Sequence, residues 1–272
     1  MKTELSVYLE MIDKAYLQCK PEDFDGMLRS IVRDALAEYG HDDLRRAVIL
    51  NEWGGYCRNT HKFKASEEAF LEAIAIQKEL VGEMDPDYAT SLNNLAGLYR
   101  LSGEYEKSEE LFMKTIQIYR ETLPRGHYLY MSSLNNLALL YQGMSLYEEA
   151  ASLLQEAADI LKMKENSESQ VGYATSISNL AAVFIKMTRY RESEALLNEA
   201  LIIYRKILGK EHPLFAAALN NLGSVYFANG DPQGAKASFK AAFEICMLKL
   251  GPSHPETIKA QKNLAHLEAL LQ

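Results

Sequence analysis

The residues with the most regular spacing in this sequence are pairs of asparagines. The string LNNLA occupies residues 92–96 and 134–138, and close variants begin at Ile177 and Leu219. A carboxamide side chain carries both an N–H donor and a carbonyl acceptor, and an extended peptide backbone exposes the same two groups. The chemistry that this pattern offers is therefore hydrogen bonding to a peptide.

Residues that could catalyse a reaction or bind a metal show no such pattern. The sequence has no P-loop and no GxGxxG, GxSxG or HExxH motif. His212 and His254 each precede a proline, so we expect them to cap helices. Cys19, Cys57 and Cys246 form no CxxC pair, which predicts buried thiols in a reducing compartment. We predict no enzyme activity, no catalytic residue, no metal and no cofactor.

Composition narrows the class of protein. Of the 272 residues, 48% are apolar and 24% are charged, as in globular domains, and the low numbers of glycine (15) and proline (7) favour helices. The net charge of −8 makes nucleic acid a poor partner. Apolar runs such as residues 181–185 are far shorter than the ~18 residues that span a bilayer. With no signal peptide at the start, we expect a cytoplasmic, mostly helical protein without membrane insertion.

The asparagines lie in an internal repeat. Its copies begin at residues 50, 92, 134, 177, 219 and 261, so the period is 42 residues with one step of 43. A constant period indicates one supersecondary unit stacked many times. In each unit, residues such as Leu92, Leu95, Ala96 and Tyr99 follow the spacing of an amphipathic helix. A second helix is expected from about Tyr105, with small and large residues on one face for close packing.

Turn residues separate the expected helices. Small or turn-tolerant residues follow the first helix of four units, where they are suited to ending a helix: Gly103, Ser145, Thr188 and Gly230. Prolines precede the first helix of three units, where their missing N–H costs nothing: Pro86, Pro213 and Pro255.

This pattern resembles the tetratricopeptide repeat. In the last full unit, the signature positions are Leu219, Leu222, Gly223, Tyr226, Ala235, Phe239 and Ala242. The usual repeat has about 34 residues; the longer period, the LNNLA string and the linker of residues 208–213 resemble the kinesin light chain variety. Two departures are Cys57 at the Tyr position and a third linker, residues 164–169, that lacks Gly and His-Pro. The resemblance implies an all-α fold, a right-handed solenoid of stacked antiparallel helix pairs.

The two ends of the chain match the repeat less well. Residues 1–43 are expected to form a degenerate helical hairpin that caps one end of the stack. Residues 44–256 would form five repeats, and residues 257–272 a single capping helix.

Helix geometry predicts where the asparagines lie. At about 100° per residue, Asn94 lies about 140° from the centre of the core stripe, and the family resemblance implies that the first helix of each pair lines the concave surface. Asparagine is costly inside a helix, so its repetition indicates either a bound peptide or hydrogen bonds that interlock the repeats. Both explanations stay open. The column continues through Asn136, Asn179, Asn221 and Asn263, with Asn93, Asn135 and Asn220 beside it.

Charge narrows the expected ligand. Arg58, Arg100 and Lys186 flank the asparagines, against the single acid Glu52, whereas most acids fall on the second helices. We therefore expect a mildly positive groove for an acidic or carboxylate-bearing peptide. The candidate groove residues are Asn93, Asn94, Arg100, Asn135, Asn136, Asn179, Lys186, Asn220, Asn221 and Asn263.

The sequence thus predicts a protein–protein interaction module that binds an extended peptide segment of a partner. One alternative is an architectural scaffold with an empty groove that associates with itself, as a homo-oligomer. Another is a bacterial sensor of signalling peptides, although such proteins carry an effector region in front of the repeats, and 43 residues leave little room for one.

Overall fold

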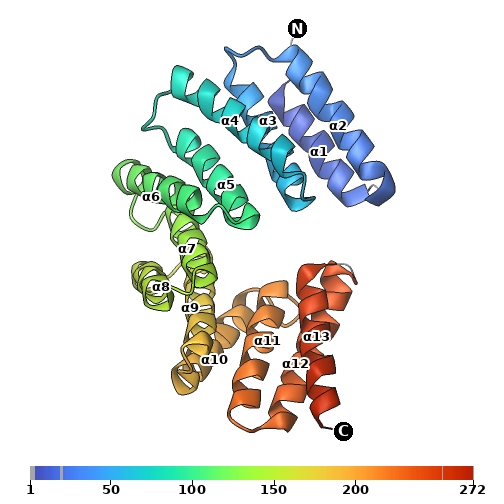
Figure 1. The fold of residues 1–272 in the computed structure, drawn as a ribbon, viewed down its shortest axis with the longest axis vertical. Coiled ribbons are helices and arrows are strands. Elements are labelled where there is room, and N and C mark those ends of the chain that lie inside the picture. Colours follow the sequence, from blue (N-terminus) through green and yellow to red (C-terminus); the bar gives the residue numbers. More distant parts are fainter. Residues whose placement is uncertain (1–3, 19–20, 253, 272) are drawn as a thin grey trace. The chain divides into compact units, whose positions relative to one another are not determined.

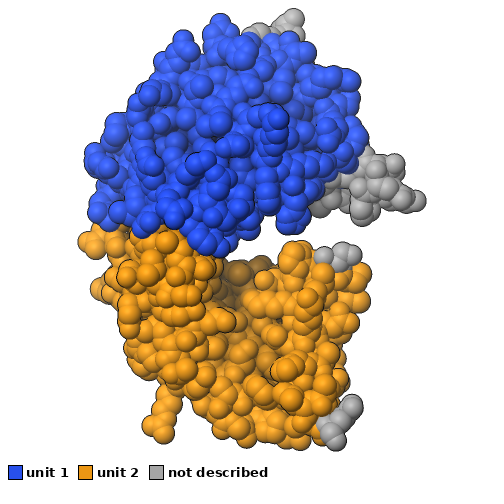
Figure 2. Space-filling model, viewed as in Figure 1, with its two compact units in different colours: residues 1–124 blue, residues 125–272 orange. Residues whose placement is uncertain are grey.

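The computed structural model describes residues 4–18, 21–252 and 254–271, and the side chains of these residues outside 16–24. Within these ranges the regular structure consists of thirteen α-helices and contains no strand, which confirms the predicted fold class. The chain divides into two compact units, Met1–Pro124 and Arg125–Gln272 (Figure 2). The prediction for Cys19 lies outside the described residues.

The first unit is a stack of helices that each contact the next along the chain (Figure 1). Contact also occurs between α3 and α5, which belong to successive repeats. The helices are α1 (Leu5–Gln18), α2 (Pro21–Glu38), α3 (Leu44–Asn59), α4 (Phe63–Leu80), α5 (Pro86–Ser102) and α6 (Tyr105–Thr122).

The second unit repeats this arrangement, with α7 in contact with α9 and α9 in contact with α11. Its helices are α7 (Tyr128–Gly143), α8 (Tyr147–Lys162), α9 (Ser167–Lys186), α10 (Tyr190–Ile207), α11 (Pro213–Ala228), α12 (Pro232–Leu250) and α13 (Pro255–Leu270). We call α3, α5, α7, α9, α11 and α13 the first helices, and the surface that they share within each unit the first-helix face.

The turn inside each repeat depends on one backbone conformation. Just after the first helix, φ is positive at the four residues that were expected to end it, Gly103 (85°), Ser145 (63°), Thr188 (58°) and Gly230 (76°). His61 has φ of 58° at the same position of the first repeat. Only glycine adopts this region without cost, so tertiary packing must hold the three other residues there.

The starts of the first helices also follow the sequence. Pro86, Pro213 and Pro255 are the first residues of α5, α11 and α13. The Nδ1 atoms of His212 and His254 each accept a backbone N–H at 3.2 Å, which confirms that both residues are helix caps.

Small residues let the two helices of a pair pack closely. In three repeats a buried serine of the second helix donates its hydroxyl hydrogen to a carbonyl of the first helix: Ser66 to Gly54 at 2.7 Å, Ser108 to Ala96 at 2.8 Å and Ser193 to Ala181 at 2.9 Å. A Cβ on Gly223 would lie 2.7 Å from the Phe239 ring, so a side chain there would push α11 and α12 apart. These contacts help to set the spacing of the helices in these four pairs.

The N-terminal helices are attached to the first repeat by an ion cluster. Asp25 of α2 accepts hydrogen bonds from Tyr56 Oη at 2.7 Å, Arg29 Nε at 2.8 Å and the Lys62 ammonium. Lys62 is the main cause that holds the pKa of Asp25 well below its usual value. Beside this cluster, burial raises the pKa of the Cys57 thiol to about 11, so little reactive thiolate forms at neutral pH.

Candidate functional site

In the first unit, an asparagine pair joins α3 to α5 across successive repeats. Asn94 Nδ2 donates to Asn51 Oδ1 at 3.3 Å. Asn51 Nδ2 in turn donates to Ser91 Oγ at 2.7 Å, and Ser91 donates to Gln77 Oε1 at 2.6 Å. Ser91 and Gln77 are buried. The pair therefore belongs to a chain of hydrogen bonds that runs through three helices.

The second unit contains two equivalent links. Asn179 Nδ2 donates to Asn135 Oδ1 at 3.0 Å, and Asn263 Nδ2 donates to Asn220 Oδ1 at 2.9 Å. In each link, as in the first unit, the second asparagine of one repeat donates to the first asparagine of the repeat before it. The interlocking that the sequence left open thus exists at three steps of the stack.

These links use only part of the capacity of the donating amides. A carboxamide has two N–H groups and a carbonyl oxygen that accepts two hydrogen bonds. Asn94, Asn179 and Asn263 each give one N–H to the preceding repeat, and their Oδ1 atoms have no partner among the residues described. All three are half-buried. Each link therefore orients an amide while leaving its acceptor available.

The link is missing at one step. Asn221 of α11 follows a repeat in which Ser178 occupies the first-asparagine position. Ser178 is buried, and the shorter serine side chain does not reach the amide. In the described part of the chain, the half-buried side chain of Asn221 has no hydrogen-bond partner. The donors and the acceptor of this amide are all available.

Two arginines lie near the C-terminal ends of α3 and α5. Arg58 and Arg100 are half-buried in the last turns of these helices. Arg58 Nη1 would lie 3.1 Å from a Cβ on Gly97, so the glycine makes room for the guanidinium. Burial lowers the pKa of both arginines, and the charge of Arg100 lowers that of Arg58 further. Within the described ranges, neither guanidinium has a hydrogen bond or an ion pair.

The other predicted residues are dispersed on the first helices. Asn93 and Asn136 are half-buried, on α5 and α7 respectively, and Lys186 is exposed in the last turn of α9. Asn220 is buried, with 4% of its surface exposed, so it serves the link and not the surface. Glu52, the acid among these positions, is exposed on α3; partial loss of hydration, and to a smaller extent the nearby charge of Asp13, raises its pKa.

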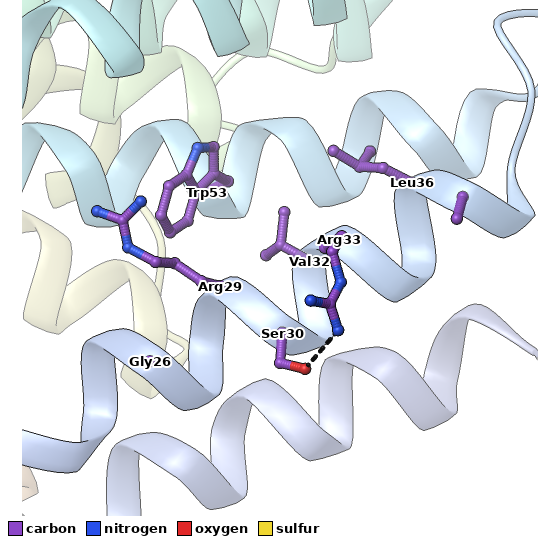
Figure 3. Close-up of a pocket in the computed structure, with 8 residues that line it drawn as sticks. Gly26, Arg29, Ser30, Val32, Arg33, Leu36 and Trp53 are labelled. Carbon is purple, nitrogen blue, oxygen red and sulfur yellow. Dashed lines mark hydrogen bonds between the residues drawn. The ribbon is translucent and has the colours of Figure 1, made fainter.

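Sequence reasoning did not find a pocket of about 600 Å³ that lies between α2 and α3 (Figure 3). Trp53 forms one wall, with Arg29 and Arg33 beside it. Both arginines already have carboxylate partners, Asp25 at 2.8 Å and Asp34 at 3.0 Å. The sequence feature that could have indicated this pocket is Trp53, which stands where the later repeats have leucine.

The described residues contain no group of three or more His, Cys, Asp or Glu side chains that could hold a metal ion. None of their helices has both the length and the apolar character needed to cross a bilayer.

Comparison with known proteins identifies the repeat. The family model described as Tetratricopeptide repeat matches residues 45–121, 87–163, 172–246 and 214–272. No curated protein sequence matches the chain. Among solved structures, a kinesin light chain-like protein of Podosopora anserina with nearly identical TPR-like repeats is 25% identical, with a TM-score of 0.61, over 75% of this chain and 96% of that one.

Two more distant structures share the fold over almost the whole chain. BtubC (BKLC) from P. vanneervenii is 21% identical, with a TM-score of 0.61 and 92% of each chain covered. A Rap protein complexed with Competence and Sporulation Factor is 16% identical, with a TM-score of 0.68, over 98% of this chain and 77% of that one. These likenesses confirm the predicted kinesin light chain-like repeat fold.

Proposed function

Because this chain belongs to the tetratricopeptide repeat family, we propose that it is a protein-interaction module whose first-helix face binds an extended, acidic segment of a partner protein. The fold is typical of interaction scaffolds and not of enzymes. The neighbouring Rap structure, which was solved with Competence and Sporulation Factor bound, supports a binding role for this architecture.

The observation that carries the proposal is the spare hydrogen-bonding capacity of the second asparagines. Asn94, Asn179 and Asn263 are held in place by the preceding repeat, and their carbonyl oxygens remain unpaired among the described residues. An extended peptide presents backbone N–H groups that fit such acceptors. Because the amides are fixed before binding, little side-chain entropy is lost when they engage a ligand.

Charge favours an acidic segment. Although the chain carries −8 overall, the first helices present Arg58, Arg100 and Lys186. A basic face on an acidic protein attracts acidic segments and repels basic ones. Binding of acidic peptides should therefore weaken as salt is added.

Asn221 offers the cleanest test, because it has spare capacity and no link to lose. Short randomised peptides would be selected against the wild-type protein, and the affinity of the selected peptides would be measured by fluorescence anisotropy. We expect Asn221→Ala to weaken binding about 2- to 12-fold for each hydrogen bond lost. The unfolding midpoint should not fall. The exposed Asn198 of α10 provides the matched control, Asn198→Ala, which should bind as wild type does.

Two outcomes would contradict the proposal. One is equal affinity of Asn221→Ala and wild type for every selected peptide. The other is failure of the wild-type protein to select any peptide, in which case sedimentation equilibrium would test the alternative of a scaffold that associates with itself.

A further inference from the structure

Trp53 is the one tryptophan of the chain, and it stands at a core position that is only partly covered. The equivalent leucines of the next four repeats are all 5% exposed or less: Leu95, Leu137, Leu180 and Leu222. Trp53 is half-buried, and its ring forms a wall of the pocket of about 600 Å³ between α2 and α3 (Figure 3). The first repeat therefore leaves an aromatic surface accessible where the other repeats are closed.

One face of α2 forms the rest of this pocket, which we call the Trp53 pocket. Val32 and Leu36 give it apolar surface, and the small residues Gly26, Ser30 and Ala37 keep it wide. A Cβ on Gly26 would meet no described atom within 4 Å, so packing within the described chain does not explain a glycine that is unfavourable inside a helix. The volume lies within the range of small-molecule sites, about 300–1,000 Å³.

Two arginines make the Trp53 pocket positive. Arg29 and Arg33 line it, and the other described residues that line it carry no charge. Their ion pairs with neighbouring aspartates are exposed, and exposed pairs contribute little to stability. Asp25, the partner of Arg29, also accepts hydrogen bonds from Tyr56 and Lys62. It therefore keeps two partners when Arg29 turns to a ligand.

The positive charge lies beside the aromatic surface. The Cζ atom of Arg29 is 5.3 Å from the centre of the Trp53 ring. Arg33 follows one turn later on α2 and donates to Ser30 Oγ at 3.1 Å (Figure 3). A second ring can pack against an indole, and guanidinium groups bind the oxygens of carboxylates and phosphates. One ligand can therefore contact the indole and the arginines together.

We propose that the Trp53 pocket binds an aromatic anion, whose ring packs against Trp53 and whose acidic group binds Arg29 and Arg33. None of the residues that line the pocket is a candidate groove residue for the partner segment. The site is therefore separate from the proposed peptide-binding function, and either can fail without the other.

The first test uses the fluorescence of Trp53, which reports on the pocket without any label. Phenyl phosphate and phenylacetate, which combine a ring with an acidic group, are titrated into the full-length protein. Benzyl alcohol supplies the ring without the charge, and inorganic phosphate the charge without the ring. We expect a saturable change in emission with the ring acids and at least about tenfold weaker binding of the two matched compounds.

The relative affinities identify the acidic group. Tighter binding of phenyl phosphate assigns the pocket to a phosphate ester, and tighter binding of phenylacetate assigns it to a carboxylate. No saturable change with either ring acid would overturn the proposal. Binding of benzyl alcohol or inorganic phosphate as tight as that of the ring acids would overturn it too, because ring and charge would then not act together.

The second test fills the pocket. Gly26→Leu adds a side chain in the open space beside α2, and leucine favours a helix more than glycine does. We expect the variant to lose binding of both ring acids, whereas its midpoint of urea unfolding should not fall. Wild-type affinity in Gly26→Leu would contradict the location of the site.

The third test removes the charges. Arg29→Gln/Arg33→Gln should weaken binding of the ring acids at least about tenfold and leave the weak binding of benzyl alcohol unchanged. The control Arg125→Gln/Arg191→Gln removes two exposed arginines of the second unit and should bind as wild type does. An equal loss in the control would refute the assignment to Arg29 and Arg33, because net charge alone would then explain it.

Discussion

Polar side chains at two positions along the neighbouring helices α3 and α5 differ in whether they have hydrogen-bond partners. At one level Asn51 and Asn94 hydrogen-bond to each other and to a buried chain through Ser91. About two turns further on, the charge of Arg100 lowers the pKa of Arg58, and neither arginine has a partner among the described residues. The repeated asparagines use part of their hydrogen-bonding capacity to join successive repeats, whereas the two arginines, which are not repeated in the later units, have no partner among the described residues.

The second unit offers an internal control for this comparison. Asn179 and Asn221 occupy the same position in successive repeats, but only Asn179 is linked to the repeat before it. Replacements at these positions can separate the contribution of a link from the contribution of a free amide.

The largest expected loss in the free energy of unfolding comes from a replacement in the apolar core, and it serves as the reference for the other predictions. Leu137 of α7 is 1% exposed. Leu137→Ala should lower the free energy of unfolding by ~2–5 kcal/mol because it leaves a cavity. Urea unfolding of the whole chain measures this loss. A loss below ~1 kcal/mol would mean that the repeat packs less tightly than described.

Replacement of a linked asparagine should cost less. Asn179→Ala removes one hydrogen bond and leaves Asn135 Oδ1 without its donor, so we expect a loss of ~1 kcal/mol, partly offset by the higher helix propensity of alanine. Asn221→Ala should be neutral or stabilise slightly, since it removes no link. Urea unfolding of the two variants side by side measures the difference. Equal losses would show that the link contributes nothing to stability.

The missing link can also be built. Ser178→Asn places a carbonyl acceptor where the other repeats have one, and we expect a gain of ~0.5–1 kcal/mol from a new bond with Asn221. A double-mutant cycle with Asn221→Ala measures the coupling between the two residues. Ser178→Ala serves as the control that changes the position without adding an acceptor. Zero coupling would contradict the geometry inferred from the other links.

The smallest change in the free energy of unfolding is expected for replacement of Arg100. Arg100→Gln removes a like-charge contact and breaks no ion pair, so the free energy of unfolding should stay constant or rise by up to ~0.5 kcal/mol, more at low salt than at high salt. Thermal unfolding at two ionic strengths measures it. A loss of ~1 kcal/mol or more in the free energy of unfolding would show that Arg100 stabilises the fold, contrary to this prediction.

Much of the fold could be predicted because it depends on local residue types. The prolines at helix starts, the histidine caps and the turn residues Ser145 and Thr188 all act within a few residues of their position. The positive φ of His61 was not predicted, although histidine adopts this conformation more often than most residues other than glycine.

The candidate site depends on distances between repeats, which the sequence does not contain. Helix arithmetic placed Asn94 away from the core but could not show that its amide reaches Asn51. Arg58 and Arg100 are 42 positions apart in the sequence, and only the contact between α3 and α5 makes them a pair.

The three hydrogen bonds described between asparagines all run from a later repeat to an earlier one, so the two ends of this series need different residues. In the first repeat the donating position holds Glu52, whose ionised carboxylate has no hydrogen to give to a helix before it. In the last helix the accepting position holds Lys262, whose ammonium has no lone pair to offer to a helix after it. A further repeat stacked before α3 or after α13 would therefore find no carboxamide at the position that the other repeats use for this link.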